Sequence, residues 1–138
     1  ETLYKACDII SLHMPLLENT RHFVNAETIA KMKDGVTIIN CARGELMNIP
    51  DMIRGIETQK IGALALDVFD KEDGIYHENR RDDILSNRDM AYLRQFPNVI
   101  MTQHMAFYTD AAVQSMVFCG IEGLCDFART GHTATELV

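Results

Sequence analysis

Four side chains whose types could together carry out acid–base chemistry on an anionic molecule follow short apolar segments: Arg43, Asp67, Glu72 and His104. A guanidinium group binds a carboxylate through two parallel hydrogen bonds, and an imidazole beside a carboxylate can give or take a proton near neutral pH. Each residue alone has an ordinary explanation. A strand-end Arg or Asp is commonly solvated or caps a turn, and a single His more often packs or lies at the surface. The four residues form one site only if the fold gathers them.

The segments before these residues indicate an α/β fold, because short apolar runs alternate with helical patterns. The predicted strands are residues 8–13, 36–40, 61–67 and 98–102. Since they are largely apolar on both faces, we expect a parallel sheet covered by helices on both sides. Their last residues are polar: His13, Asn40, Asp67 and Thr102. In doubly wound sheets the ligand crevice lies beyond the carboxyl ends of the strands, so the chemistry is predicted there.

Capping residues mark the predicted helices. These run from Asn25 to Lys33, from Asn48 to about Ile56, over residues 89–94, and from Thr109 or Asp110 to about Ala128. Gly35 and Gly131 are expected to close the first and the last of them. Residues 70–88 are rich in charged and turn-forming residues, which predicts a long loop.

Composition narrows the possible partners. The net charge of −7 argues against a nucleic acid or an anionic membrane surface, since both favour a basic face. We find no apolar run near the roughly 20 residues that cross a bilayer and no secretory signal, so we expect a cytoplasmic protein without a membrane partner. The four cysteines are scattered and have no metal-ligand spacing, which predicts free thiols and no metal site.

Three motifs, in this order, resemble the C-terminal portion of the D-isomer-specific 2-hydroxyacid dehydrogenases, in the branch of the D-lactate and (R)-2-hydroxyisocaproate dehydrogenases. Residues 40–44 (NCARG) resemble the family's N-x-x-R-G. Residues 65–69 (ALDVF) with Glu72 resemble A-x-D-V-(F/Y)-x-x-E, and residues 104–109 (HMAFYT) resemble H-T-A-F-Y-T. The resemblance covers nearly the whole chain.

The resemblance implies an NAD-dependent oxidoreductase that acts on a small 2-oxo or 2-hydroxy acid. Arg43 would bind the substrate carboxylate and polarise the 2-oxo group. Its planar guanidinium can form two parallel hydrogen bonds to a carboxylate, which the ammonium group of lysine cannot do. His104 would be the general acid toward the 2-oxo oxygen. Glu72 would hydrogen-bond the imidazole, fix its tautomer and favour the imidazolium. The cofactor would supply the hydride.

Cofactor contacts are also implied by the resemblance. The matching positions are Met14, Pro15, Thr20, Cys41, Ala42, Arg43 and Asp67. Asp67 would meet the carboxamide of the nicotinamide. Met14 and Pro15 could equally form an ordinary strand-end turn, and His13 could be a cofactor neighbour or only a strand terminator. Phe107 would line the substrate pocket, although aromatic residues that open a helix also serve as core anchors.

By the same resemblance, residues 1–108 would be the C-terminal half of the NAD-binding domain, and residues 109–138 the helix and tail that return to the substrate domain. No G-x-G-x-x-G is present, so we expect a truncated gene product or an expressed fragment. Alone, it should bind NAD weakly and self-associate through the edge of its first strand. Gln103 stands where most relatives have proline and Met105 replaces a common threonine, so we expect the loop carrying the histidine to be less rigid.

Three functions stay open at this point. The first is an enzyme that reduces a 2-oxo acid to its D-2-hydroxy acid and is a homodimer in its full-length form. The second is a nucleotide-sensing module of the same fold without turnover. The third is a non-catalytic module that keeps a dimerisation surface. The Arg43, Glu72 and His104 set favours the enzyme, since a sensor needs no matched acid–base pair.

Overall fold

A computed structural model describes residues 2–77, 79 and 87–136 of the chain. It consists of two units, one extending to His104 and the other starting at Met105. The sequence placed a boundary four residues later, between residues 108 and 109. Each unit is described separately below.

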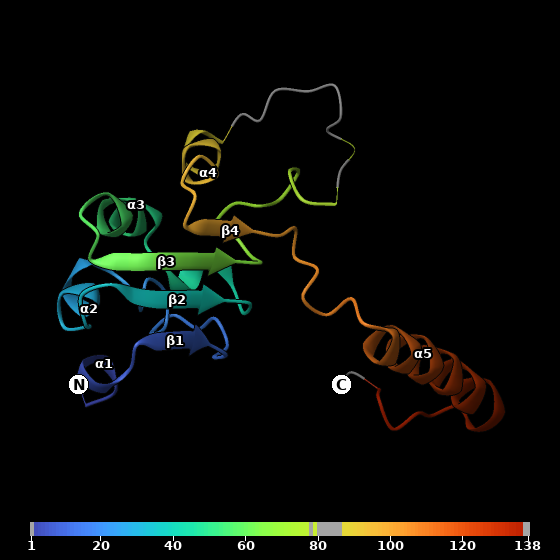
Figure 1. The fold of residues 1–138 in the computed structure, drawn as a ribbon. Coiled ribbons are helices and arrows are strands. Elements are labelled where there is room, and N and C mark those ends of the chain that lie inside the picture. The colour runs from blue at the N-terminus through green and yellow to red at the C-terminus, as the bar shows by residue number, and fades with distance from the viewer. Residues whose placement is uncertain (1, 78, 80–86, 137–138) are drawn as a thin grey trace. The chain divides into compact units, whose positions relative to one another are not determined.

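The first unit is built on a parallel four-stranded sheet in the order β1-β2-β3-β4 (Figure 1). The strands are β1 (Ile9–Leu12), β2 (Val36–Asn40), β3 (Ile61–Leu66) and β4 (Val99–Met101). All four were predicted from the sequence, and the α/β class is confirmed. The last residues of the strands are in register, because Leu12 pairs with Asn40, Asn40 with Leu66, and Leu66 with Met101. The segments that follow the strands therefore leave the sheet along one common edge.

Helices separate successive strands: α2 (Ala26–Ala30), α3 (Ile49–Glu57) and α4 (Arg88–Leu93). Each new strand pairs with the preceding strand on the same edge of the growing sheet. Right-handed crossovers then place all three helices on one face of the sheet. The contacts agree, since α3 packs against β3 and against both α2 and α4.

The other face of the sheet is open among the described residues of the first unit. Ile10 and Leu12 are buried, whereas Ile9 on β1 and Ile100 on β4 are 62% and 67% exposed. The helices expected on the second face are not among the described elements of the first unit. The strands add in one direction, so the three connections between them all run over the first face.

The core fills the space between the sheet and the three helices. Its fully buried side chains include Ile38, Leu46, Met47, Met52, Ile61, Leu64, Leu66, Met90 and Leu93. Burying an aliphatic side chain of this size stabilises a fold by about 1.5–3 kcal/mol. This packing holds the carboxyl ends of the strands in place.

Helices α2 and α3 are capped by the side chains of the predicted residues, Asn25 and Asn48. The Asn25 side chain accepts hydrogen bonds from the backbone of Glu27 and Thr28 and forms a capping box with Thr28. That helix ends at Ala30, before the predicted Lys33, and the chain then turns at Gly35 (φ 76°), whose N–H donates to the Lys60 carbonyl. Asn48 caps α3, with Pro50 in the first turn.

Two short elements had no clear signal in the sequence. Helix α1 (Thr2–Ala6) has no buried residue and therefore no apolar stripe that could reveal it. A 3₁₀ turn, η1 (Gly44–Leu46), directly follows Arg43, for which the sequence predicted a catalytic role. It is too short for a periodic pattern, yet it shapes the candidate site.

The second unit contains α5 (Asp110–Thr130). Thr109 caps its start and Gly131, with φ 77°, ends it, as the sequence predicted. None of its residues is buried. By length and composition α5 could cross a membrane, although the sequence analysis found no apolar run of that length. Length and hydropathy alone do not separate such a helix from one that packs on protein.

Candidate active site

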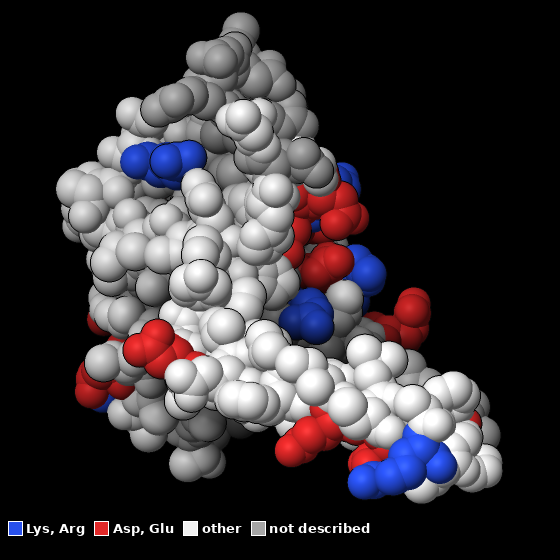
Figure 2. All heavy atoms as spheres, turned by 90° about the vertical axis from the view of Figure 1, so that its right-hand side faces the viewer, with Lys and Arg blue, Asp and Glu red and all other residues white. Residues whose placement is uncertain are grey.

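A cavity of about 290 Å³ lies where the carboxyl ends of β2 and β3 meet the segment after β4. It is lined by Arg43, Gly44, Glu45, Phe69, Asp70, Lys71, Glu72, Asp73 and His104. All of these belong to the first unit. The structure therefore brings together the three residues for which the sequence predicted a catalytic role. Figure 2 shows acidic and basic side chains close together on the side of the molecule toward which the strands point.

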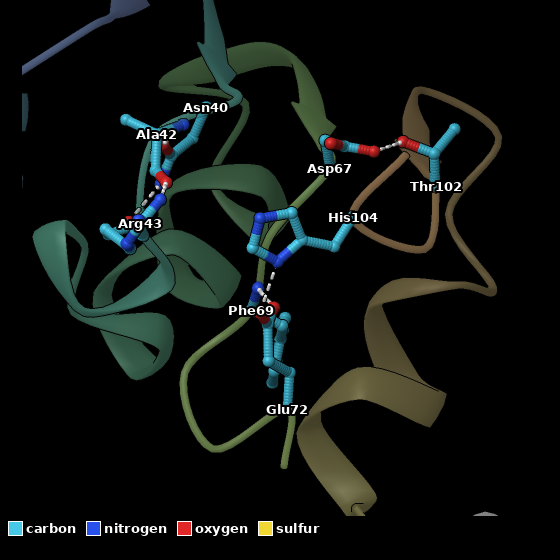
Figure 3. A network of polar contacts seen from close by, with 8 residues as sticks. All are labelled: Asn40, Ala42, Arg43, Asp67, Phe69, Glu72, Thr102 and His104. Carbon is cyan, nitrogen blue, oxygen red and sulfur yellow. Dashed lines mark hydrogen bonds and ion pairs between the residues drawn. The ribbon is translucent and has the colours of Figure 1, made fainter. Parts of the chain in front are cut away.

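His104 and Glu72 form the hydrogen-bonded pair that the motif predicted (Figure 3). The distance between His104 Nδ1 and Glu72 Oε1 is 2.6 Å. Since a carboxylate only accepts, Nδ1 carries the proton of this bond. The other carboxylate oxygen, Oε2, accepts from the Phe69 N–H at 2.7 Å, so both oxygens are fixed. This geometry leaves Nε2 as the ring nitrogen that can serve a ligand.

The backbone holds His104 in an uncommon conformation. Its φ is 54°, in the left-handed region that costs a residue with a Cβ of order 1–3 kcal/mol. The His104 N–H donates to the Asp67 carbonyl at 2.6 Å, which anchors the turn to the end of β3. The side chain is about one-third exposed, which gives a solute access to the ring.

Glu72 is positioned by the turn that follows it. The N–H groups of Ile75 and Tyr76 both donate to the Glu72 carbonyl, at 2.9 and 3.1 Å. Their side chains pack against the core. Burial and the carboxylates of Glu72 and Asp67 raise the pKa of Tyr76 to about 12, so its hydroxyl stays protonated at neutral pH. Of the predicted 70–88 loop, residues 78 and 80–86 lie outside the part of the chain that the structure describes.

The Arg43 turn is held by a buried amide. Asn40 is fully buried at the end of β2. Its Nδ2 donates to the Arg43 carbonyl at 2.8 Å, and its Oδ1 accepts from the Ala42 N–H at 3.0 Å. The Arg43 side chain is exposed, and its Nη1 donates to the Ala42 carbonyl at 2.7 Å. The turn therefore directs a guanidinium to the rim of the cavity.

Gly44 joins the Arg43 turn to the Glu72 segment. A Cβ at Gly44 would lie 2.1 Å from the Phe69 carbonyl carbon and 2.3 Å from the Asp70 nitrogen. The two backbones are thus packed so closely that only glycine fits. Neither Asn40 nor Gly44 was assigned a role from the sequence, although both belong to its N-x-x-R-G motif.

We expect Gly44→Ala to lower the free energy of unfolding of the intact protein by at least about 2 kcal/mol, because backbone atoms have to move apart. Urea denaturation measures this. Gly120→Ala is the matched control, since Gly120 lies inside α5 with nothing within 4 Å of an added Cβ. Alanine there should be neutral or stabilise by up to about 1 kcal/mol. Equal unfolding curves for Gly44→Ala and the parent would contradict the close contact.

Asp67 directly follows β3 and is nearly fully buried, with 4% exposure. The Thr102 hydroxyl, just after β4, donates to Asp67 Oδ1. Partial burial and the Asp67 carboxylate raise the pKa of the Cys41 thiol. Cys41 and Asp67 are thus electrostatic neighbours, although they follow different strands.

This proximity predicts how fast Cys41 reacts. Only the thiolate is alkylated, so the raised pKa should slow iodoacetamide at pH 8. Asp67→Asn removes one of the two causes, lowers the pKa and should accelerate alkylation severalfold. Mass spectrometry of the Cys41 peptide measures the rate, and Cys119 in α5 serves as the reference. A rate at Cys41 that is unchanged or slower in the variant would contradict the coupling.

The residues assigned to the cofactor line the edge of the sheet in strand order. Met14 and Pro15 follow β1, Cys41 and Ala42 follow β2, and Asp67 follows β3. This row suits an elongated ligand lying across the strand ends. A buried carboxylate at one end of the row can accept from an amide N–H, so the residues present fit a dinucleotide.

The Thr20 hydroxyl forms hydrogen bonds within the turn that contains Thr20. Its hydroxyl accepts from the Leu17 N–H at 2.7 Å and donates to the Pro15 carbonyl at 2.9 Å. Met14 packs against the core and Pro15 is exposed. Thr20 thus shapes the segment that would contact the cofactor. His13, exposed and hydrogen-bonded to Ser11, stays open between its two interpretations.

Phe107 lies in the second unit, where its ring meets that of Tyr108 edge to face at 6.1 Å. Its predicted place in the pocket wall stays a prediction. The sequence had not singled out His77, whose ring lies 6.1 Å from the His104 ring. It belongs to the loop, where no motif marks it.

Parallel strands in sequential order, with chemical groups collected at their carboxyl ends, define a dinucleotide-binding α/β domain of the Rossmann-like type. Residues 1–106 match the family described as D-isomer specific 2-hydroxyacid dehydrogenase, NAD binding domain. The chain belongs to this family, as its three motifs indicated.

Known relatives support the assignment over the whole chain. The chain is 44% identical to an aromatic 2-oxoacid reductase of Clostridium sporogenes, over 100% of its own length and 42% of that protein. A D-lactate dehydrogenase of Treponema pallidum has a TM-score of 0.94 at 33% identity, covering 99% of this chain and 41% of that one. A D-lactate dehydrogenase of Lactobacillus jensenii, solved with NAD⁺, has a TM-score of 0.91 at 34% identity, with 99% and 41% covered. The chain spans about two-fifths of the length of these relatives.

Proposed function

We propose that the intact protein reduces a small 2-oxo acid to its D-2-hydroxy acid with NADH. The observation that carries this proposal is the His104 Nδ1–Glu72 Oε1 hydrogen bond at the rim of a cavity that Arg43 also lines. An imidazolium and a guanidinium at one cavity can bind an anion and protonate its carbonyl oxygen. The names of the relatives support the same substrate class.

Each residue has a defined task in this proposal. Arg43 leaves its contact with the Ala42 carbonyl and binds the substrate carboxylate through both guanidinium arms. His104 Nε2 donates a proton to the 2-oxo oxygen. Glu72 holds Nδ1, which fixes the ring orientation and stabilises the imidazolium. When bound, NADH supplies the hydride to the carbonyl carbon.

The cofactor would lie along the strand ends, near Met14, Pro15, Cys41, Ala42 and Asp67. The Asp67 carboxylate would accept from the carboxamide N–H of the nicotinamide. The Thr20 hydroxyl would hold the turn after β1 that contacts the dinucleotide, through its bond to the Pro15 carbonyl. Phe107 is proposed as a pocket wall, and a homodimer and a cytoplasmic location are proposed for the intact protein.

The proposal is tested by NADH oxidation at 340 nm with the intact protein. Pyruvate, 2-oxoisocaproate and phenylpyruvate are the test acids, and the C. sporogenes relative makes phenylpyruvate the first choice. Acetone, which has the carbonyl group without a carboxylate, is the control and should not react. Absence of NADH oxidation with every acid would favour the nucleotide-sensing alternative.

A further inference from the structure

The buried Asp67 carboxylate has a fixed donor. Asp67 is 4% exposed, and the Thr102 hydroxyl donates to its Oδ1 (Figure 3). Thr102 itself is held by the sheet, because its N–H donates to the Leu66 carbonyl at 2.9 Å. The hydroxyl therefore reaches Asp67 from a rigid backbone rather than from a loose loop.

The backbone of Asp67 is fixed on both sides. Its N–H donates to the Asn40 carbonyl at 3.0 Å, and its carbonyl accepts from the His104 N–H at 2.6 Å. Asp67 thus stands between the turn that carries Arg43 and the turn that carries His104. A group that binds the Asp67 carboxylate is therefore held in a fixed position relative to the Arg43 turn and the His104 turn.

We propose that Thr102 is a positioning residue whose hydroxyl holds the Asp67 carboxylate in the orientation that accepts the carboxamide N–H of the nicotinamide. This inference rests on the proposed function. A carboxylate on a strand end can rotate about its terminal bond, and each oxygen can accept more than one hydrogen bond. The Thr102 hydroxyl selects one orientation before the cofactor arrives, which reduces the cost of ordering on binding.

Two replacements separate the hydroxyl from the shape of the side chain. Thr102→Val keeps the volume and removes the donor, whereas Thr102→Ser keeps the donor and removes the methyl group. Loss of the contribution of one charge-assisted hydrogen bond should weaken NADH binding by about 3- to 30-fold in Thr102→Val. Thr102→Ser should stay within about twofold of the parent. Fluorescence titration of the intact protein measures both affinities without turnover.

A cofactor analogue provides the decisive comparison. The 3-acetylpyridine analogue of NADH carries an acetyl group in place of the carboxamide, so it has no N–H to donate at this position. Its affinity should be equal for the parent and Thr102→Val. If Thr102→Val weakens NADH and the analogue alike, the role of Thr102 is only structural and the inference is wrong. It is equally wrong if Thr102→Val binds NADH like the parent, or if Thr102→Ser is as weak as Thr102→Val.

The parent protein distinguishes this inference from the proposed function. A parent that binds NADH and reduces a 2-oxo acid, together with Thr102 variants that lack the expected pattern, would overturn the role of Thr102 alone. A parent that binds no NADH would overturn both.

Discussion

Replacing His104 by Gln in the intact protein should lower kcat for 2-oxo acid reduction by about two to four orders of magnitude, the usual contribution of a positioned acid. The change removes the imidazole whose Nδ1 lies 2.6 Å from Glu72 Oε1, and the amide that replaces it cannot deliver a proton. NADH affinity should change little, because no cofactor contact is assigned to this ring. Initial rates of NADH oxidation and a fluorescence titration measure the two quantities.

Glu72→Gln is the companion variant, since it keeps the shape of the side chain and removes its charge. The Glu72 carboxylate then no longer accepts from His104 Nδ1 at 2.6 Å, so the ring is held less firmly and kcat should fall by about tenfold or more. Initial rates of NADH oxidation at saturating substrate measure this loss. A Glu72→Gln variant with the kcat of the parent would refute the functional pairing. A His104→Gln variant with the kcat of the parent would refute the acid itself.

Replacing Arg43 by Lys should raise the KM for the 2-oxo acid by about 10- to 100-fold and lower kcat, because lysine keeps the charge without the planar fork. The loss corresponds to one charge-assisted hydrogen bond of about 1.5–3 kcal/mol. Within the described part of the chain, the Arg43 guanidinium donates to the carbonyl of the adjacent Ala42, so the fold should tolerate lysine. Steady-state kinetics with phenylpyruvate measures both constants.

The control for Arg43→Lys is the affinity for NADH, which should stay within about twofold of the parent. Arg54→Lys on the exposed side of α3 is a matched change away from the cavity and should alter neither constant. If Arg43→Lys weakens NADH binding as strongly as substrate binding, Arg43 serves the cofactor or the fold instead of the carboxylate.

The elements with strong local signals were predicted from the sequence. The strands are short apolar runs with polar ends, and Asn25, Asn48 and Thr109 cap the helices because their side chains satisfy free N–H groups. The open face of the sheet was not predicted. Apolar residues on both sides of a strand indicate that both faces of the sheet can be covered. They do not identify the segment of the protein that covers each face.

The sequence marks the candidate catalytic residues through three motifs, whereas it does not mark the residues that support them. In the sequence Asn40 is recognisable only as the polar residue at the end of a strand. Its two hydrogen bonds to the Arg43 turn can be seen only once the backbone is folded. Gly44 is required by its approach to Phe69, a residue 25 positions away, which no local pattern contains. Such long-range contacts become visible only when strands are paired.

The measurement that tests the central claim most directly is the configuration of the product. In the proposed function, Arg43 would hold the carboxylate and His104 the oxygen of the 2-oxo group, so hydride from a cofactor bound on one side would reach one face of the planar carbonyl. Chiral chromatography of the product from phenylpyruvate and NADH should show the D-2-hydroxy acid alone. The L-enantiomer, a racemate, or no product at all would contradict the account.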